Sequence, residues 1–253
     1  MGANTDDHRL ARDLAEGAGR LLLALRDELG ARGVEPKELK DEGDRRAHVW
    51  LMERLAEARP DDAVLSEEAT ADEQRESTRL GSSRVWIIDP LDGTREYGEG
   101  RDDWAVHVAL VVDGVPVAGA VALPAQCVTF DTGGPPAVPD APGRLRVVVS
   151  RTRPPREALA IATAMDAELV EMGSAGAKAM SIIQGRSDLY PHSGGQYEWD
   201  SCAPVAVALA AGLCCTRLDG SPLEYNRPNP YLPDLLICRP EHAGAAMAAA
   251  AGA

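Results

Sequence analysis

One stretch, residues 85–94 with the sequence VWIIDPLDGT, constrains this chain more than any other. Its first four residues are β-branched or aromatic and predict a buried strand, which ends at two carboxylates, Asp89 and Asp92. Pro90 fixes φ and Gly93 allows backbone conformations closed to other residues, so we expect a tight, rigid turn that presents both carboxylates. Such a pair suits a hard cation, although Asp, Pro and Gly are also the usual residues of an acidic surface turn.

Carboxylates recur after other apolar segments. A short strand predicted at residues 63–65 runs into Glu67 and Glu68, and Asp200 stands at the predicted start of a small-residue helix. Asp44 ends a polar stretch that contains Gly and Pro, where it suits either a helix N-cap or a place in the site. The expected ligand set consists only of oxygen donors: Glu67, Asp89, Asp92 and Asp200. Asp44 and Glu68 are carboxylates of the same type.

This ligand set contains neither Cys nor a His pair, and it therefore favours Mg²⁺ or Mn²⁺ over zinc or copper. Magnesium is usually held by a few carboxylates together with substrate phosphate, and paired ions stabilise displacement at phosphorus. Phosphoester hydrolysis is therefore the leading class of reaction. Two carboxylates could also catalyse glycoside hydrolysis, but a sugar cleft would need aromatic residues, which make up only 4% of the chain.

Composition limits the partners and the compartment. The 253 residues are 45% hydrophobic, which suffices for one compact unit or two closely packed halves. A formal net charge of −14 disfavours a nucleic acid polymer or an anionic membrane as a partner. No apolar run approaches the roughly 20 residues of a membrane span, and the N-terminus lacks the pattern of a signal peptide. We expect a cytoplasmic protein whose five cysteines are reduced core residues.

The first half predicts a scaffold of helices and an antiparallel ladder. Leucines and alanines at steps of three and four predict an amphipathic helix over residues 10–29, and a second helical pattern runs from Val49 to Pro60. Two strands at 104–112 and 115–123 are joined by Asp113-Gly114, a hairpin signal.

The Pro- and Gly-rich residues 131–143 predict a connection between two halves of one structural unit. Residues 1–130 would carry the metal-binding motifs, and residues 144–253 would complete the site. The second half alternates between strands and helices, which predicts a layered α/β arrangement. The predicted strands are 145–149, 169–172 and 188–190, the predicted helices are 155–165, 175–183 and 203–211, and a terminal helix follows from residue 243.

Several polar residues in these elements have more than one interpretation. Gly173 and Ser174 precede the helix that carries Lys178, so free N–H groups there could bind an anion, or Ser174 could simply cap the helix. His107 alternates with apolar residues and is interpreted as a core or face residue rather than a ligand. His192, in a turn before two glycines, is a candidate for lining a pocket.

Four motifs are spaced along both halves: Asp44, SEE at residues 66–68, DPLDGT at 89–94 and WD at 199–200. In these motifs the chain resembles the inositol monophosphatase superfamily of lithium-sensitive, magnesium-dependent phosphatases. The resemblance implies the α-β-α-β-α sandwich of the inositol monophosphatase and fructose-1,6-bisphosphatase type, an α/β fold that is often dimeric.

Within the superfamily, GSAGAK at residues 173–178, Glu198 and GSPLEYN at 220–226 are most similar to the CysQ-like 3′(2′),5′-bisphosphate nucleotidases. This group removes the 3′-phosphate of 3′-phosphoadenosine 5′-phosphate in sulfur assimilation. Inositol 1-phosphatase and fructose-1,6-bisphosphatase activities are the alternatives, and an inactive metal or nucleotide sensor is a further one. The substrate is in each case a small phosphate ester.

Carried over position by position, the resemblance assigns two or three Mg²⁺ ions, with Mn²⁺ as a substitute, to six residues: Glu67, Glu68, Asp89, the Leu91 carbonyl, Asp92 and Asp200. It assigns activation of the attacking water to Asp44, Thr94 and Glu67. It assigns the substrate to Asp92, Gly93, Thr94, Ser150, Arg151, Gly173, Ser174, Lys178 and Asp200. The alternative is that Lys178 is a solvated helix residue and Arg151 a surface turn residue. The chain departs from the family pattern at Glu42, which lies two residues before Asp44. Many members have Thr at the corresponding position.

Overall fold

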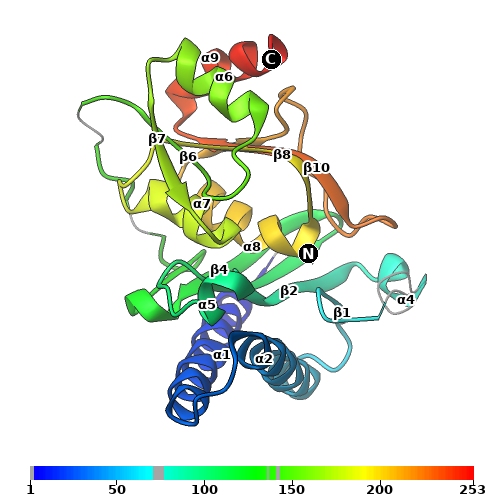
Figure 1. The fold of residues 1–253 in the computed structure, drawn as a ribbon. Helices are drawn as coiled ribbons and strands as arrows, with labels where there is room; N and C mark the ends of the chain where they lie inside the picture. Colours follow the sequence, from blue (N-terminus) through cyan, green and yellow to red (C-terminus); the bar gives the residue numbers. More distant parts are fainter. Residues whose placement is uncertain (1–2, 71–76, 136, 141–142) are drawn as a thin grey trace.

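The computed structural model describes residues 3–70, 77–135, 137–140 and 143–253, which form two five-stranded sheets with helices between and outside them (Figure 1). Figure 1 shows the layers from bottom to top: helices α1 and α2, the first sheet, helices α7 and α8, the second sheet, and helices α6 and α9. This arrangement confirms the predicted α-β-α-β-α sandwich.

The first sheet has the order β1-β2-β3-β4-β5. Its strands are β1 (Ala63–Ser66), β2 (Arg84–Asp92), β3 (Ala105–Val112), β4 (Val115–Leu123) and β5 (Val128–Asp131). β1 runs parallel to β2 and the other neighbours are antiparallel. The predicted hairpin is confirmed, because Asp113 and Gly114 adopt φ values of 50° and 82° between β3 and β4.

β2 continues further than the sequence predicted. Residues 85–92 are all buried, and the strand includes Asp89 and Asp92, with an irregularity in its pairing to β3 between these two residues. The chain changes direction only at Gly93, whose φ of 86° is left-handed, before the short helix α5 (Thr94–Gly98). The expected turn after residue 88 is therefore wrong, and the two acids are held by the sheet itself.

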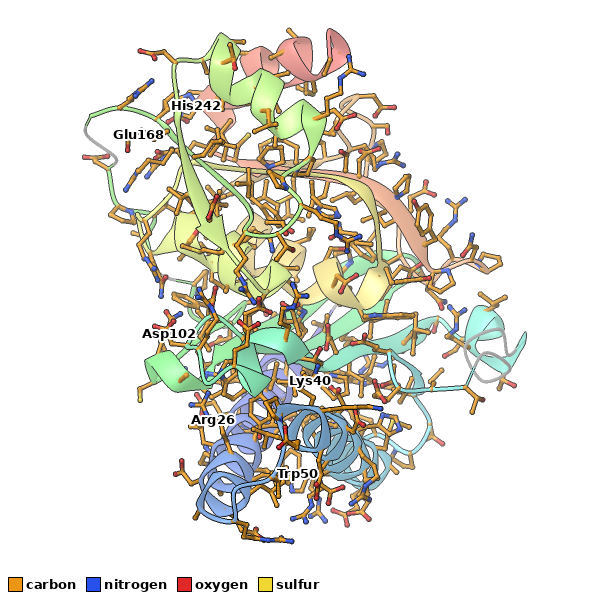
Figure 2. The ribbon with its side chains drawn as sticks, viewed as in Figure 1. Arg26, Lys40, Trp50, Asp102, Glu168 and His242 are labelled. Carbon is orange, nitrogen blue, oxygen red and sulfur yellow. The ribbon has the colours of Figure 1, made fainter. Side chains whose placement is uncertain are left out.

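Helices α1 (Thr5–Ala31) and α2 (Pro36–Ala58) cover the outer face of the first sheet. Trp50 of α2, labelled in Figure 2, packs so closely on Gly17 of α1 that a Cβ there would overlap its ring. Arg26 of α1 lies over the rings of Tyr97 and Trp104, at 5.7 and 5.5 Å from their centroids. The first contact holds α1 against α2, and the second holds α1 against the segment that follows β2.

Asp44 lies inside α2, so its interpretation as a helix N-cap is wrong. The helix begins at Pro36 with Glu35 as its N-cap, because proline suits the first helical position and the following residues favour helix. Gly43 does not interrupt the helix. A Cβ there would lie 3.1 Å from side-chain atoms of Leu91 and Tyr97, so the glycine lets α2 approach the end of β2 closely.

The second sheet has the order β7-β6-β8-β10-β9. Its strands are β6 (Arg146–Ser150), β7 (Glu168–Met172), β8 (Leu189–Tyr197), β9 (Cys214–Thr216) and β10 (Tyr231–Cys238). β6 is parallel to β7 and β8, whereas β10 is antiparallel to β8 and β9. Sequence patterns did not predict β5, β9 or β10, because two of them are very short and Pro233 and Asp234 interrupt the third.

The inner helices α7 (Ala175–Ile183) and α8 (Glu198–Ala210) lie between the two sheets and form the central core with them. The outer face of the second sheet packs on α6 (Arg156–Ala164) and α9 (Pro240–Ala251). A short α4 (Ser77–Gly81) and a 3-10 helix (Pro124–Gln126) complete the described elements. Both inner helices begin near the end of β2, which determines where the site forms.

The predicted connection at residues 131–143 includes residues 136 and 141–142, which lie outside the described residues. β5 ends at Asp131 and β6 begins at Arg146, so the two sheets fall on either side of it. All five cysteines are free thiols, but Cys127 is exposed, which corrects the expectation that every cysteine is a core residue. Among the described residues, no helix is long and apolar enough to cross a membrane.

Candidate active site

Three carboxylates from two layers meet at the end of β2. Ligand oxygens of Asp89, Asp92 and Asp200 all lie within 4.8 Å of one another. The first two are delivered by β2 and the third by the first turn of α8. Asp200 also accepts the backbone N–H of Tyr197 at 2.6 Å, so it caps its helix and faces the cluster at the same time.

The charges of this cluster repel one another in a buried place. Burial, and then the charges of Glu67, Asp92 and Asp200, raise the pKa of Asp89 well above its usual range. Burial and the charge of Asp92 raise the pKa of Asp200 to about 6. Burial and the charge of Asp200 raise the pKa of Glu67 to about 7, although a hydrogen bond with Asp89 lowers it.

The donor set fits a divalent cation. Asp89 Oδ1 accepts the Leu91 N–H at 3.0 Å, and Oδ2 is buried without a hydrogen-bond donor among the described residues. A hard cation bound by carboxylate oxygens would satisfy Oδ2 and remove the repulsion. Glu67 interacts with Asp89 and Asp200, and Leu91 bonds to Asp89 through its N–H, but the assignment of these residues as metal ligands stays a prediction.

Asp92 differs from its neighbours because the protein supplies its partners. Its carboxylate accepts the Ala175 N–H at 3.1 Å, the Gly176 N–H at 2.7 Å and the Ser174 hydroxyl. His107 Nε2 lies 3.2 Å from the same carboxylate. Burial alone would raise the pKa of Asp92, but His107 and these donors lower it overall.

Of the two alternatives for the start of α7, anion binding by its N–H groups is wrong, because the protein itself occupies them. Asp92 takes two of its N–H groups, and the Ser174 hydroxyl caps a third, that of Ala177, at 3.0 Å. The capping role of Ser174 is confirmed. Through these bonds, Asp92 at the end of β2 fixes the start of α7.

His107 was interpreted as a core residue, and its contact with Asp92 was missed. It is fully buried in β3, opposite Asp89 in the strand register, and its Nδ1 lies 3.0 Å from the Trp199 carbonyl oxygen. It thus joins β3, the end of β2 and the start of α8. A single titratable residue in an otherwise apolar strand was the signal in the sequence.

Asp44 reaches the site from the opposite side, within α2. Burial, followed by the charges of Glu68, Glu67 and Asp41, raises the pKa of Asp44 to about 8. Its Oδ1 is buried without a hydrogen-bond partner among the described residues. Asp44 and Glu67 therefore belong to the electrostatic environment of the cluster, whereas the Glu68 side chain is exposed at its edge.

A cavity of about 400 Å³ adjoins the acids. The predicted substrate residues that line it are Asp92, Gly93, Ser150, Arg151, Gly173, Ser174, Lys178 and Asp200. Thr94 does not line it, although the adjacent Gly93 does. A Cβ on Gly93 would lie 3.0 Å from Ser174, so this glycine permits the close approach of β2 and α7.

The two cations that the sequence assigned to the substrate, Lys178 and Arg151, have partners within the protein. Lys178 is only 5% exposed, and its Nζ donates to the carbonyls of Ser174, at 2.9 Å, and of Gly173. Burial lowers its pKa, and the alternative of a solvated helix residue is therefore wrong. Arg151 is held by Glu96 and Glu99, each at 2.7 Å. Their roles toward a substrate remain predictions.

His192 does line this cavity, as the sequence suggested. Sequence reasoning missed several lining residues that belong to no motif, among them Arg95, Glu96, Tyr190, Gln196 and Tyr197. Tyr197 stacks on Trp199 with ring centroids 4.7 Å apart.

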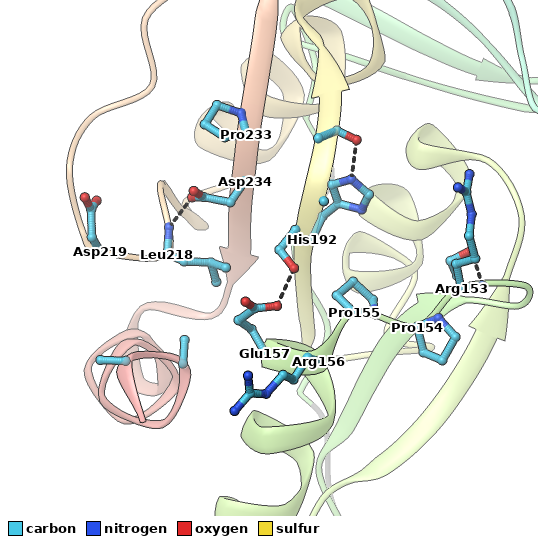
Figure 3. Close-up of a pocket in the computed structure, with 16 residues that line it drawn as sticks. Arg153, Pro154, Pro155, Arg156, Glu157, His192, Leu218, Asp219, Pro233 and Asp234 are labelled. Carbon is cyan, nitrogen blue, oxygen red and sulfur yellow. Dashed lines mark hydrogen bonds between the residues drawn. The ribbon is translucent and has the colours of Figure 1, made fainter. Parts of the chain in front are cut away.

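A larger hollow of about 800 Å³ shares Ser150, His192 and Gly195 with the first and extends between α6, β8, β10 and α9 (Figure 3). The described contacts within it are internal: Ser193 donates to Glu157, and the Leu218 N–H donates to Asp234 at 2.8 Å. None of the acids of the cluster lines it. We therefore place the active site in the smaller cavity.

The fold and the acidic site define a class of phosphoric monoester hydrolases. A profile of the inositol monophosphatase family matches residues 6–251, and the chain belongs to this family.

Individual members of the family give a more specific comparison than the family profile does. The chain is 52% identical over 248 residues to a 3′-phosphoadenosine 5′-phosphate phosphatase of Mycobacterium tuberculosis (strain CDC 1551 / Oshkosh), covering 93% of this chain and 90% of the relative. It is 31% identical over 240 residues to the 3′(2′),5′-bisphosphate nucleotidase CysQ of Escherichia coli (strain K12), covering 87% and 94%. The crystal structure of CysQ from Bacteroides thetaiotaomicron superposes with a TM-score of 0.79 at 26% identity, covering 93% and 97%.

Proposed function

We propose that this protein is a magnesium-dependent phosphatase that hydrolyses 3′-phosphoadenosine 5′-phosphate to AMP and phosphate, in sulfur assimilation. The observation that carries the proposal is the 52% identity, over nearly the whole chain, to relatives named for this activity. The acids that meet beside the cavity support it. In this proposal the enzyme acts in the cytoplasm on a small phosphate ester, binds neither a nucleic acid polymer nor a membrane, and is compatible with a homodimer.

In the proposed mechanism, two or three Mg²⁺ ions, or Mn²⁺ in their place, would be held by Glu67, Glu68, Asp89, the Leu91 carbonyl, Asp92 and Asp200. When bound, the ions neutralise charge on the phosphoryl group and on the departing oxygen. Asp92 is held in place by the start of α7, so its oxygens need no reorganisation during the reaction.

Asp44 and Thr94 would orient and deprotonate the attacking water, together with Glu67. Burial raises the pKa of Asp44 to about 8 without bound ions, and bound cations would lower it toward neutrality, where a carboxylate can accept a proton near pH 7. Gly93 and Thr94 would donate backbone N–H groups to the scissile phosphate. Ser150, Arg151, Gly173, Ser174 and Lys178 would contact the remainder of the nucleotide.

A substrate panel tests this function. With purified protein and Mg²⁺, phosphate release should be fastest, by kcat/KM, from 3′-phosphoadenosine 5′-phosphate, and slower from inositol 1-phosphate and fructose 1,6-bisphosphate. EDTA should abolish release and added Mg²⁺ should restore it. A preference for either alternative substrate would overturn the nucleotide proposal, and no release from any of the three would favour an inactive sensor.

Lithium provides a second test of the ion positions. Li⁺ is a small, hard cation that carboxylate oxygens can bind, but its single charge would neutralise departing phosphate less well than Mg²⁺. We expect LiCl to inhibit phosphate release at the Mg²⁺ optimum. KCl at the same ionic strength is the control, and equal inhibition by both salts would indicate screening of charge instead.

A further inference from the structure

Gln196 is a buried amide without a partner in the wall of the active-site cavity. It is 7% exposed, and both Oε1 and Nε2 are buried without a hydrogen-bond partner among the described residues. It lines the cavity of about 400 Å³ together with Asp200, Lys178 and Tyr190. Buried amides are normally hydrogen-bonded, since an unsatisfied one destabilises the fold, so this exception points to a ligand.

The polar side chains around Gln196 form their hydrogen bonds with other groups and not with its amide. His192 Nε2 lies 3.1 Å from the Gly195 carbonyl oxygen, Asp200 accepts the Tyr197 N–H, and Lys178 donates to two carbonyls. Each of these side chains thus has a partner in the protein, and Gln196, among them, has none. Its Nε2 donor and its Oε1 acceptor are therefore both available to a molecule in the cavity.

The backbone that carries Gln196 is held firmly. It lies near the end of β8 and is paired with Leu232 of β10. The preceding Gly195 has a φ of 91° and lies directly under the Tyr231 ring, where a Cβ would overlap the ring. A group intended to discriminate between substrates requires such a rigid support.

Its position also determines which part of a substrate it meets. The next residue, Tyr197, donates its N–H to Asp200 at 2.6 Å, and Gln196 and Asp200 line the same cavity. In the proposed function Asp200 and its neighbouring acids face the scissile phosphate, so Gln196 lies close to that end of the substrate. In a sugar phosphate, the polar group nearest to the phosphate is the hydroxyl on the neighbouring carbon. A hydroxyl both donates and accepts, which matches the free oxygen and nitrogen of an amide.

We propose that Gln196 is a specificity-determining residue that binds the hydroxyl vicinal to the scissile phosphate, which is the 2′-hydroxyl of a nucleoside 3′,5′-bisphosphate. The inference rests on the proposed function and adds a preference for ribose over 2′-deoxyribose. An amide also matches the N6 and N7 edge of adenine. The base, however, lies farther from the scissile phosphate than the 2′-hydroxyl does, and Gln196 lines the same cavity as Asp200.

The test compares 3′-phosphoadenosine 5′-phosphate with 2′-deoxyadenosine 3′,5′-bisphosphate, which differ only at this hydroxyl. Wild-type protein should prefer the ribonucleotide in kcat/KM by about 5- to 150-fold, the effect of leaving one buried polar group unpaired. Gln196→Met, which keeps the length of the side chain, should lose a similar factor on the ribonucleotide and little on the deoxynucleotide. The variant should therefore show almost no preference between the two.

Gln126→Met is the matched control, because Gln126 is outside the cavity and hydrogen-bonded to the Asp102 carbonyl and to Gln184. It should keep the wild-type preference. Gln196→Met should melt at the same temperature as wild type or higher, since it removes an unsatisfied amide.

Other results would overturn the inference in distinguishable ways. Equal losses on both nucleotides would show that Gln196 binds the base or acts structurally. A wild-type protein that hydrolyses both nucleotides equally would exclude recognition of the 2′-hydroxyl even without a variant. Hydrolysis of neither nucleotide would overturn the proposed function itself, and with it the role of Gln196.

Discussion

Replacing Asp89 by Asn is expected to lower kcat/KM by at least about 100-fold. Loss of a residue that only supports a metal ligand already costs up to about 100-fold, and loss of a ligand should cost at least as much. An amide oxygen cannot supply the charge that holds a divalent cation against water. The same change should raise the melting temperature of the metal-free protein. The reason is that burial and the charges of Glu67, Asp92 and Asp200 all disfavour the ionised form of Asp89.

Asp92→Asn should cause a similar loss of activity with the opposite effect on stability. Asn can accept hydrogen bonds through only one atom, whereas the Asp92 carboxylate accepts two N–H groups and the Ser174 hydroxyl. Its contact with His107 would weaken as well. Hydrogen bonds to a charged group contribute roughly 1.5–3 kcal/mol each, so the variant should unfold at a lower temperature than wild type.

Thermal melts in EDTA and steady-state assays with Mg²⁺ measure both effects. Asp219→Asn is the control, since this exposed carboxylate bonds to Ser221 away from the acidic cluster. Stability changes of the same sign in the Asp89 and Asp92 variants would contradict the different surroundings derived for the two acids. Wild-type activity of either variant at saturating Mg²⁺ would contradict its assignment as a ligand.

The acids of the site could be predicted because their positions depend on local sequence. A buried strand followed by Asp89 and Asp92, and an acid at the start of a small-residue helix, are recognisable without knowledge of the tertiary structure. What the sequence could not show is which oxygens meet. The sequence allowed either a bound anion or a capping Ser174 at the start of α7, but not Asp92, which is 82 residues before Ser174 and occupies its N–H groups.

The missed residues share this dependence on tertiary packing. Asp44 was left as either a helix N-cap or a site residue, because the polar stretch before it contains Gly and Pro, and only the course of α2 through it shows that it is not a cap. His107 and Gln196 have no motif. Only the pairing of β3 with β2 brings His107 to Asp92, and only the pairing of β8 with β10 places Gln196 in the cavity wall. The alternation of strands and helices, by contrast, was sufficient to predict the layered fold.

The largest effect on stability is expected from pH and Mg²⁺ together. The pKa values of Asp200, Glu67 and Asp44 are raised to about 6, about 7 and about 8, mainly by burial. A carboxyl group with a raised folded-state pKa binds protons more tightly in the folded than in the unfolded protein. Its contribution to stability is therefore fully present below about pH 4 and is lost as pH rises through the folded value.

Metal-free protein should accordingly melt at progressively lower temperature as the pH is raised from 5 to 8.5. Burial also raises the pKa of Asp89 and Glu198, which act in the same direction. His192, whose pKa is lowered by burial, acts in the opposite direction but is a single group. Acids such as Asp103, whose pKa is lowered overall although burial opposes this, affect stability mainly below pH 4 and lie outside this interval.

Mg²⁺ should reverse this loss, because a divalent cation binds the ionised carboxylates and competes with protons for them. At 100 times its dissociation constant, a ligand that binds only the folded state stabilises it by about 2.7 kcal/mol, which for a chain of this size corresponds to roughly 5–10 °C. The gain should be larger at pH 8 than at pH 5, where protons occupy the site. Differential scanning calorimetry in EDTA and in Mg²⁺ across this pH range, with KCl matched for ionic strength, measures it. A gain that is equal at both pH values would mean that the ion binds away from these acids.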